Sequence, residues 1–390
     1  MEQPSQEGIE HCAAGRLDEA LRCFRAAMDA DPSSRAAPYN LANTLRLMGR
    51  TEDAVAAYDE ALAIAPNFSA ARHNRAFALL QLGRWKEGFR EYEWRKVCPG
   101  FEDPRYRLPN PWQGEDLRGK TLFIYPELYQ GDLIQFIRYA LLAERLGARV
   151  ILAAPRNMHA LLRTMSATLE LIEAAETPPY YDYHCALMSL PMVFGTTPDN
   201  VPSWRYLKAA PDRVSRWRKR LGKGPKVGIV WHGGDRMTDR FFPLALVREA
   251  MSDVRLISLQ KYSGLDQLAD CPSIEHIGGQ LDTGPDAFLD TAAAIACCDI
   301  FITADTSTAH LAGAMGTRTW LALHNPADWR WLEGRSDTPW YPTMRLFRQP
   351  TRGDWKGVFS EMAQEVRLTL RLPVDVLSNA PVPSTTEHPK

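Results

Sequence analysis

The residues best suited to chemistry lie in one short stretch, 302–316, which reads ITADTSTAHLAGAMG. It follows an apolar segment typical of a buried strand and continues into small residues and helix formers. The hydroxyls of Thr306, Ser307 and Thr308 are therefore expected at a helix start, where about four backbone N–H groups lack partners and the macrodipole is positive. Such a terminus binds anions, most often phosphate. The stretch predicts a site for a phosphate-bearing ligand, with simple capping of the helix by Asp305 and Thr306 as the alternative.

The surrounding pattern supplies the elements that must position this site. Residues 319–323 read as the next strand, which makes a β-α-β unit in a parallel sheet. Further buried strands are predicted at 226–231 and 255–259, and such sheets bind ligands at the carboxyl ends of their strands. A separate α/β run begins at 121–125 and continues into a helix with apolar residues at helical spacing. The sequence therefore predicts two α/β domains.

The first hundred residues repeat at a spacing of 34. Gly15, Gly49 and Gly83 open the similar phrases GRLDEALRCF, GRTEDAVAAY and GRWKEGFREY. This period resembles the tetratricopeptide repeat (TPR), a pair of antiparallel helices, although the third unit has Arg95 where the others have alanine. Stacked repeats form a curved surface that holds a peptide or partner protein. The alternative is that they only pack on the rest of the chain.

The composition excludes several classes of partner. The 390 residues carry 46 basic and 47 acidic side chains, so no global field draws the chain to nucleic acid or to a membrane surface. No apolar run approaches the roughly 18 residues of a membrane span. The N-terminus is polar, and the seven cysteines show no metal-binding or paired spacing. These features predict a cytoplasmic protein without a membrane span or nucleic-acid partners.

Composition also changes along the chain, and these changes predict an order of domains. We expect TPR repeats over 1–102, a linker over 103–119, an N-terminal α/β domain over 120–212, a C-terminal α/β domain over 213–350, a C-terminal helix over 351–377 and a disordered tail over 378–390.

Several phrases carry a family resemblance. YQGDLIQFIRYALLAERLGARV, VGIVWHGG, LISLQK and DTSTAHLAGAMG resemble a GT-B glycosyltransferase of the heptosyltransferase-like family (family 9-like), over about 120–360. The phrase DWRWLEGRSDTPWYPTMRLFRQPTRGDW resembles the C-terminal signature of the repeat-bearing bacterial branch, to which O-GlcNAc transferase is a more distant cousin. The resemblance implies α-helical TPR repeats followed by an α/β GT-B fold, in which two Rossmann-like domains flank a cleft. It makes 120–212 the N-terminal Rossmann-like acceptor domain and 213–350 the C-terminal Rossmann-like nucleotide-sugar-binding domain.

The resemblance also assigns the residues that neutralise the departing diphosphate of a nucleotide sugar. It places the diphosphate on the backbone of 306–308, with Asp305 shaping the turn. His310 either assists the leaving group or packs in the core. Arg240 is the cation expected to face the diphosphate, because the sequence predicts no metal site.

Other donor-site residues are assigned from their positions near strand ends. Gly233 and Gly234 offer backbone close to the same oxygens. Gln260 and Lys261 are expected to contact nucleoside or phosphate, and His324 ends a further strand. No cofactor is expected beyond the donor substrate, a nucleotide-diphosphate or nucleotide-monophosphate sugar.

The base that deprotonates the acceptor hydroxyl is assigned to Asp132, where the related transferases keep a catalytic aspartate. A carboxylate at a helix start is also an ordinary cap, which is the alternative for Asp132. Glu127 is the second candidate base.

Together these features predict an inverting, metal-independent glycosyltransferase whose repeats hold a protein acceptor, with flagellin-like proteins as one precedent, and which modifies a Ser or Thr hydroxyl. The alternatives are a glycan or lipopolysaccharide-type acceptor, or a TPR scaffold whose transferase half is inactive.

Overall fold

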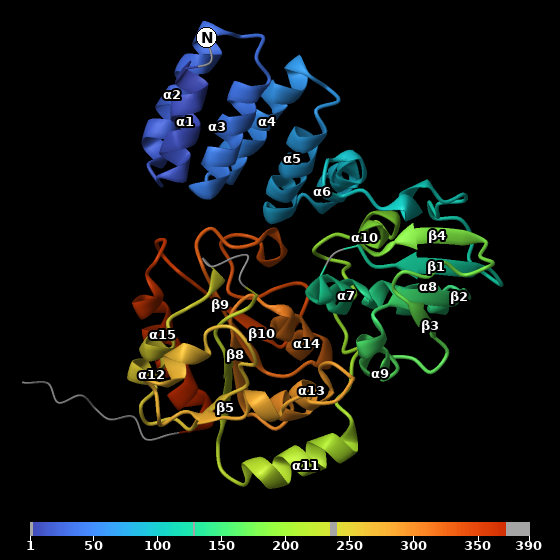
Figure 1. The fold of residues 1–390 in the computed structure, drawn as a ribbon, viewed down its shortest axis with the longest axis vertical. Helices are drawn as coiled ribbons and strands as arrows, with labels where there is room; N and C mark the ends of the chain where they lie inside the picture. Colours follow the sequence, from blue (N-terminus) through green and yellow to red (C-terminus); the bar gives the residue numbers. More distant parts are fainter. Residues whose placement is uncertain (1–2, 128, 235–239, 372–390) are drawn as a thin grey trace, which may run out of the picture.

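The computed structural model describes residues 3–127, 129–234 and 240–371, and it has three parts in chain order (Figure 1). A stack of antiparallel helices is followed by two α/β domains, each built on a parallel sheet. The fold class predicted from the sequence is therefore confirmed. The predicted end of the C-terminal helix and the predicted tail, 372–390, lie outside the described residues.

Glycine sets the turns of the helical stack. Gly15, Gly49 and Gly83 each follow the first helix of a pair with φ between 72° and 79°, a left-handed conformation that glycine adopts readily. A Cβ on Gly88 would stand 2.7 Å from Leu80 Cγ, so the close helix crossing requires glycine there. The helices are α1 (Gln3–Ala13), α2 (Leu17–Ala30), α3 (Ala36–Leu47), α4 (Thr51–Ile64), α5 (Ser69–Gln81) and α6 (Trp85–Tyr92).

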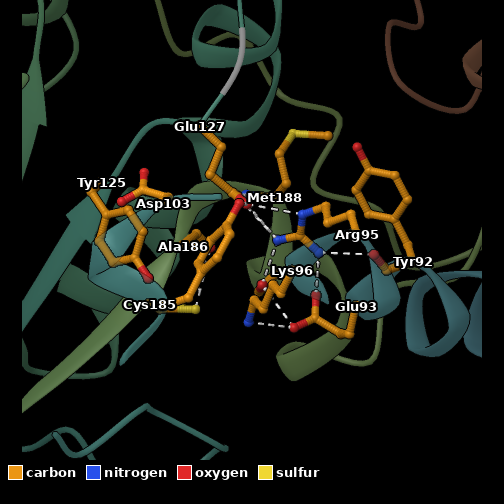
Figure 2. Close-up of polar contacts among 12 residues, drawn as sticks. Tyr92, Glu93, Arg95, Lys96, Asp103, Tyr125, Glu127, Cys185, Ala186 and Met188 are labelled. Carbon is orange, nitrogen blue, oxygen red and sulfur yellow. Dashed lines mark hydrogen bonds and ion pairs between the residues drawn. The ribbon is translucent and has the colours of Figure 1, made fainter. Parts of the chain in front are cut away.

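A buried arginine anchors the third helix pair to the first α/β domain (Figure 2). Helix α6 passes into a 3₁₀ turn, η1 (Glu93–Val97), and Arg95 in this turn is fully buried. Its guanidinium donates to both carboxylate oxygens of Glu127, at 2.9 Å and 3.1 Å, and also to Glu93 and Ser189. The third unit departs from the repeat pattern at Arg95 because this side chain binds the next domain.

The first α/β domain contains a four-stranded parallel sheet in the order β3-β2-β1-β4. Strand β1 is buried along its whole length, as expected for a central strand of a parallel sheet covered on both faces. The elements are β1 (Thr121–Tyr125), α7 (Gln130–Phe136), α8 (Arg138–Arg145), β2 (Arg149–Ala154), α9 (His159–Leu162), β3 (Glu170–Glu173), β4 (Tyr183–Ala186) and α10 (Leu190–Val193).

The second α/β domain contains a six-stranded parallel sheet in the order β10-β9-β8-β5-β6-β7. The order reverses next to β5 and β8, so the ends of these strands form the switch point where α/β sheets bind ligands. Its elements are α11 (Pro211–Leu221), β5 (Val227–Val230), α12 (Leu244–Ala250), β6 (Leu256–Ser258), β7 (Glu275–His276), α13 (Leu289–Ile295), β8 (Ile300–Thr303), α14 (Ser307–Met315), β9 (Thr319–Leu323), β10 (Met344–Arg348) and α15 (Trp355–Leu370).

The three parts share a hydrophobic core. One cluster of buried side chains runs from Leu80 and Trp85 of the repeats through both α/β domains. The two domains meet where α7 and α14 begin, and a Cβ on Gly131 would stand 3.3 Å from His310 Cδ2. Glycine at this position therefore lets the two helix starts approach closely. Within the described ranges, no helix combines the length and apolar content required to cross a bilayer.

Candidate functional site

A cavity of about 400 Å³ lies between the two α/β domains, and we call it the interdomain cavity. Its second-domain wall is formed at the carboxyl ends of β5, β6 and β8, and its first-domain wall includes Gln130 and Asn157. Most of the residues predicted to bind the donor line it together. They are Gly233, Gly234, Gln260, Lys261, Thr306, Ser307 and Thr308.

The start of α14 presents hydroxyl groups and backbone N–H groups to this cavity. Thr306 precedes the helix in an extended conformation, and its hydroxyl lies 2.8 Å from that of Thr308. The helix has no basic residue in its last turn and is almost entirely apolar beyond its first turn, so its polar surface is concentrated at its start. A Cβ on Gly233 would stand 3.3 Å from Thr306 Cγ2, so glycine brings the backbone after β5 close to this helix start. The arrangement suits an anionic group between the two segments.

Gln260 and Lys261 have different roles in the wall. The Gln260 side chain accepts hydrogen bonds from the backbone N–H groups of Trp231 and His232, and donates to the carbonyls of His232 and Ser263. Gln260 is buried and therefore fixes the shape of the wall. Lys261 brings a cation to the cavity, and its Nζ lies 3.8 Å from Asp282 Oδ2.

Arg240 occupies a different place from the one predicted. It lines a second, neighbouring cavity, and its guanidinium pairs with Asp305 at 3.1 Å and Asp328 at 2.9 Å. Burial raises the pKa of the Asp305 carboxyl. Burial also acts to raise the pKa of Asp328, but the guanidiniums of Arg330 and Arg240 hold it below its ordinary value. Asp305 thus fixes Arg240 behind the α14 turn, and among the described residues that line the interdomain cavity the cation is Lys261.

The two predicted histidines lie outside the interdomain cavity. His310 is buried, stacks on Trp331 with ring centroids 5.4 Å apart, and shares a hydrogen bond with the Tyr341 hydroxyl at 3.0 Å. Burial lowers the pKa of His310 well below its ordinary value, so this arrangement favours the packing role. His324 lines the second cavity beside Arg240, and burial followed by the Arg240 charge lowers its pKa.

Asp132 lies in the first turn of α7 and lines neither cavity, although Gln130 of the same turn lines the interdomain cavity. Its Oδ2 accepts a hydrogen bond from the Tyr129 backbone N–H at 3.1 Å, which is a capping interaction. Its Oδ1 accepts a hydrogen bond from Arg330 Nη2 at 2.5 Å, and its side chain is 10% exposed. Capping and an ion pair therefore hold the carboxylate, and the described residues leave one lone pair on each oxygen beyond these bonds.

Glu127 is placed differently, and we do not retain it as a candidate base. Its side chain is 1% exposed and accepts four hydrogen bonds, two from Arg95 and one each from the Tyr106 hydroxyl and the Met188 backbone N–H. A carboxylate has about four acceptor positions, so all of them are filled. Glu127 joins the repeats to the first α/β domain (Figure 2).

The second cavity, about 940 Å³, lies between the repeats and the second α/β domain, and we call it the repeat-facing cavity. Its repeat wall is formed by α3 and α5, and its other wall by the segments after β9 and β10. His232 lines the interdomain cavity and Phe241 lines the repeat-facing cavity. Their rings stack with centroids 4.0 Å apart, so the two cavities share a wall. Its lining residues include Asn43, Arg46, Asn74, Phe77, Arg240, His324, Asp328 and Trp329.

Sequence reasoning missed three residues that the structure places at the site. His232 lies in the quoted phrase VGIVWHGG, and Asp328 and Arg330 lie in the quoted phrase beginning DWRW, but none received a role. The available signal was the alternation of charged and aromatic residues after β9. The partners of Asp328 and Arg330 are about 90 and 200 positions away along the chain, which explains why the signal could not be interpreted.

Comparisons with known proteins identify the repeats and a curated relative. Residues 6–67 and 39–93 match the tetratricopeptide repeat family. Helices α1 to α6 are therefore tetratricopeptide repeats. The chain is 30% identical over 315 residues to Protein FlbA of Caulobacter vibrioides, a match that covers 72% of this chain and 52% of FlbA. The chain thus spans about half the length of this curated relative.

Two solved structures are each similar to part of the chain. The TPR domain of P58(IPK) is 32% identical in sequence to this protein. The match covers 24% of this chain and 26% of the P58(IPK) chain, with a TM-score of 0.23. The ADP-heptose LPS heptosyltransferase II of Escherichia coli is 14% identical in sequence to this protein. The match covers 65% of this chain and 98% of the heptosyltransferase chain, with a TM-score of 0.46.

Proposed function

We propose that the protein is an inverting glycosyltransferase that moves a sugar from a nucleotide sugar, bound in the interdomain cavity, to a Ser or Thr hydroxyl of a protein acceptor. One observation carries this proposal: backbone glycines, a lysine and a hydroxyl-rich helix start, which are far apart in sequence, converge on one cavity at the carboxyl ends of parallel strands. This combination suits a diphosphate, because helix N–H groups and a cation neutralise its charge.

The proposed chemistry uses donor-binding groups of the interdomain cavity and a carboxylate from the first turn of α7, whose Gln130 lines that cavity. The acceptor oxygen bonds to the anomeric carbon while the bond from that carbon to the phosphate oxygen breaks, and the departing phosphate keeps the electron pair. The start of α14 and Lys261 stabilise the charge that develops on the leaving group. Asp132 accepts the proton of the acceptor hydroxyl as general base. Attack opposite the leaving group inverts the anomeric configuration.

The protein acceptor is proposed to reach this site through the repeat-facing cavity. Tetratricopeptide repeats present curved surfaces to peptides, and α3 and α5 supply amide, cationic and aromatic side chains to this cavity. The His232–Phe241 stack joins the linings of the two cavities. A chain segment held against the repeats would therefore lie near the donor.

Donor binding is tested by thermal unfolding of the full chain with UDP, GDP, ADP and CMP. A nucleotide at about 100 times its dissociation constant should stabilise the protein by roughly 2.7 kcal/mol. A nucleotide that stabilises the wild type, and stabilises Lys261→Ala less, supports the donor site. If no nucleotide shifts the transition, the donor site does not work and the repeats are the functional part.

Acceptor binding is tested by transfer of labelled sugar to proteins in an extract of the source cells. Deleting the repeats would expose Trp340 of the second domain, which stacks on Trp85 of α6, so a point variant is cleaner. Phe77→Ala should reduce labelling of protein while sparing slow hydrolysis of the donor. Unchanged protein labelling by Phe77→Ala, or labelling of glycan alone, would contradict the proposed acceptor.

A further inference from the structure

The connection between β9 and β10 joins all three parts of the molecule, and we call residues 325–341 the bridging segment. On the side of the repeats, Trp340 stacks on Trp85 with ring centroids 4.8 Å apart. Glu333 accepts hydrogen bonds from Thr51 at 2.5 Å and from Gln81 at 2.8 Å. The segment is therefore fixed to the second and third repeats before it returns to its own sheet.

Arg330, in the middle of the bridging segment, reaches into the first α/β domain. Its Nη2 donates to Asp132 Oδ1 at 2.5 Å, and its Nε donates to Gln135 Oε1 at 2.8 Å. Its Nη1 donates to Asp328 Oδ1 at 2.9 Å, and its guanidinium lies 4.5 Å from the centre of the Trp329 ring. With 12% of the side chain exposed, the guanidinium has little freedom to leave this position.

The ion pairs continue beyond Arg330 to the other wall of the site. Asp328 binds Arg330 through one oxygen and Arg240 through the other, and Arg240 binds Asp305. Alternating charges therefore connect Asp305, directly before α14, with Asp132 in the first turn of α7. Each group is held by a partner of opposite charge, so displacing one of them disturbs the next.

We propose that Arg330 is a positioning residue that holds the Asp132 carboxylate in place for the acceptor hydroxyl. This inference rests on the proposed function, in which Asp132 is the base. Arg330 uses one acceptor position of Oδ1, and the Tyr129 N–H uses one of Oδ2, so the carboxylate is oriented while acceptor positions remain. Because the bridging segment is fixed to the repeats, the position of the base depends on how the repeats dock.

The test separates turnover from donor binding. Turnover of UDP-, GDP-, ADP- and CMP-sugars and the dissociation constants of the matching free nucleotides are measured for the wild-type chain, Arg330→Gln and Arg330→Lys. Arg330→Gln should lower kcat by about 100-fold, the cost of misplacing a reacting group, with the nucleotide dissociation constant unchanged. Arg330→Lys, which keeps the charge near Asp132, should recover most of the lost turnover.

The matched control is Arg335→Gln on the same segment. Arg335 pairs with Asp337, which is 71% exposed, so its loss should leave kcat and nucleotide binding at wild-type values. If the wild type is active and Arg330→Gln has the same kcat, the inference is overturned but the proposed function is not. The inference is also overturned if Arg330→Gln weakens nucleotide binding, thermal stability and kcat together and Lys restores none of them, which would indicate a purely structural role. A wild type that binds none of the nucleotides overturns the proposed function and this inference with it.

Discussion

Glu127 and Asp132 stand five positions apart, after the same strand, and each binds an arginine from another part of the chain. The partner of Glu127 is Arg95 of the repeats, whereas the partner of Asp132 is Arg330 of the bridging segment. Within the described residues, Glu127 accepts four hydrogen bonds, but Asp132 accepts one at each oxygen. The described partners therefore fill every acceptor position of the first carboxylate and leave acceptor positions on the second, which lies in the same helical turn as Gln130 of the interdomain cavity.

The difference shows that an arginine pair alone does not distinguish a structural carboxylate from a reactive one. The number of filled acceptor positions is more informative, because a carboxylate that must accept a proton needs an unoccupied lone pair facing its substrate. By this criterion Glu127 stabilises the junction of the repeats, and Asp132 remains the candidate base.

Removing Arg95 should have the largest effect. Arg95→Ala leaves the buried carboxylate of Glu127 without its charged partner, and the loss of one partner of a buried pair costs about 5 kcal/mol at the upper end of its range. Urea unfolding measures this loss. Arg22→Ala, which removes an exposed repeat pair with Glu19, is the control and should change little. Equal stability of the two variants would contradict the structural role of the Arg95–Glu127 pair.

Asp132→Asn should have the second-largest effect, and this effect should be on the turnover rate. Loss of a general base lowers the rate by about 1,000-fold, roughly 4 kcal/mol in the barrier, while nucleotide binding should be nearly unchanged. Glu127→Gln gives the opposite pattern, with lower stability and nearly normal kcat for the folded fraction. Steady-state kinetics and calorimetric nucleotide titration check both variants. Normal transfer by Asp132→Asn would show that the base is elsewhere.

A smaller effect is expected from pH near the Arg95 junction. Burial, and then the charges of Arg95 and Arg46, lower the pKa of His73 from 6.5 to about 4. Between these values the unfolded chain binds a proton that the folded chain does not, so stability falls as pH decreases from 6.5 towards 4. From pH 7 to pH 5 the loss due to His73 should be about 2 kcal/mol.

This pH effect is measured by urea unfolding of the wild type and His73→Gln at both pH values. The variant should lose less stability than the wild type on acidification. Identical losses would mean that His73 does not titrate between the folded and unfolded states as described.

The smallest effect concerns the cations, which repeat the contrast between the two carboxylates. Arg240 is held by two carboxylates at 3.1 Å or less, whereas Lys261 lies 3.8 Å from one. Lys261→Ala should weaken nucleotide binding about tenfold, or roughly 1.4 kcal/mol. Arg240→Gln should weaken it less. Calorimetric titration compares them, and a larger loss in Arg240→Gln would restore the assignment made from the sequence.

Much of this organisation could be predicted from the sequence because it depends on local patterns. The 34-residue period predicted the helix pairs, since each repeated glycine ends a helix in a left-handed conformation. The apolar strands and the hydroxyl-rich turn after β8 predicted a parallel sheet with a ligand site at its edge. The residues chosen near the ends of β5, β6 and β8 line one cavity because parallel strands place their carboxyl ends side by side.

The errors and omissions concern side chains whose partners are distant in the chain. Arg240 follows β5 in sequence, yet Asp305 and Asp328 hold it in the repeat-facing cavity. Glu127 was predicted as a second candidate base because it is near Asp132 in sequence. Hydrogen bonds from Arg95, Tyr106 and Met188 fill the acceptor positions of its carboxylate. No spacing rule relates these positions, so their pairing could not be foreseen.

The sequence by itself determined the repeats, the two parallel sheets and the chemical character of the turn that begins α14, because periodicity, strand composition and helix-start chemistry act over a few residues. Only the tertiary structure decided which carboxylate is saturated, which cation faces the interdomain cavity and how the bridging segment connects the repeats to Asp132. These choices depend on hydrogen bonds and ion pairs between distant residues, whose strength depends on burial and geometry that exist only after the three parts have packed together.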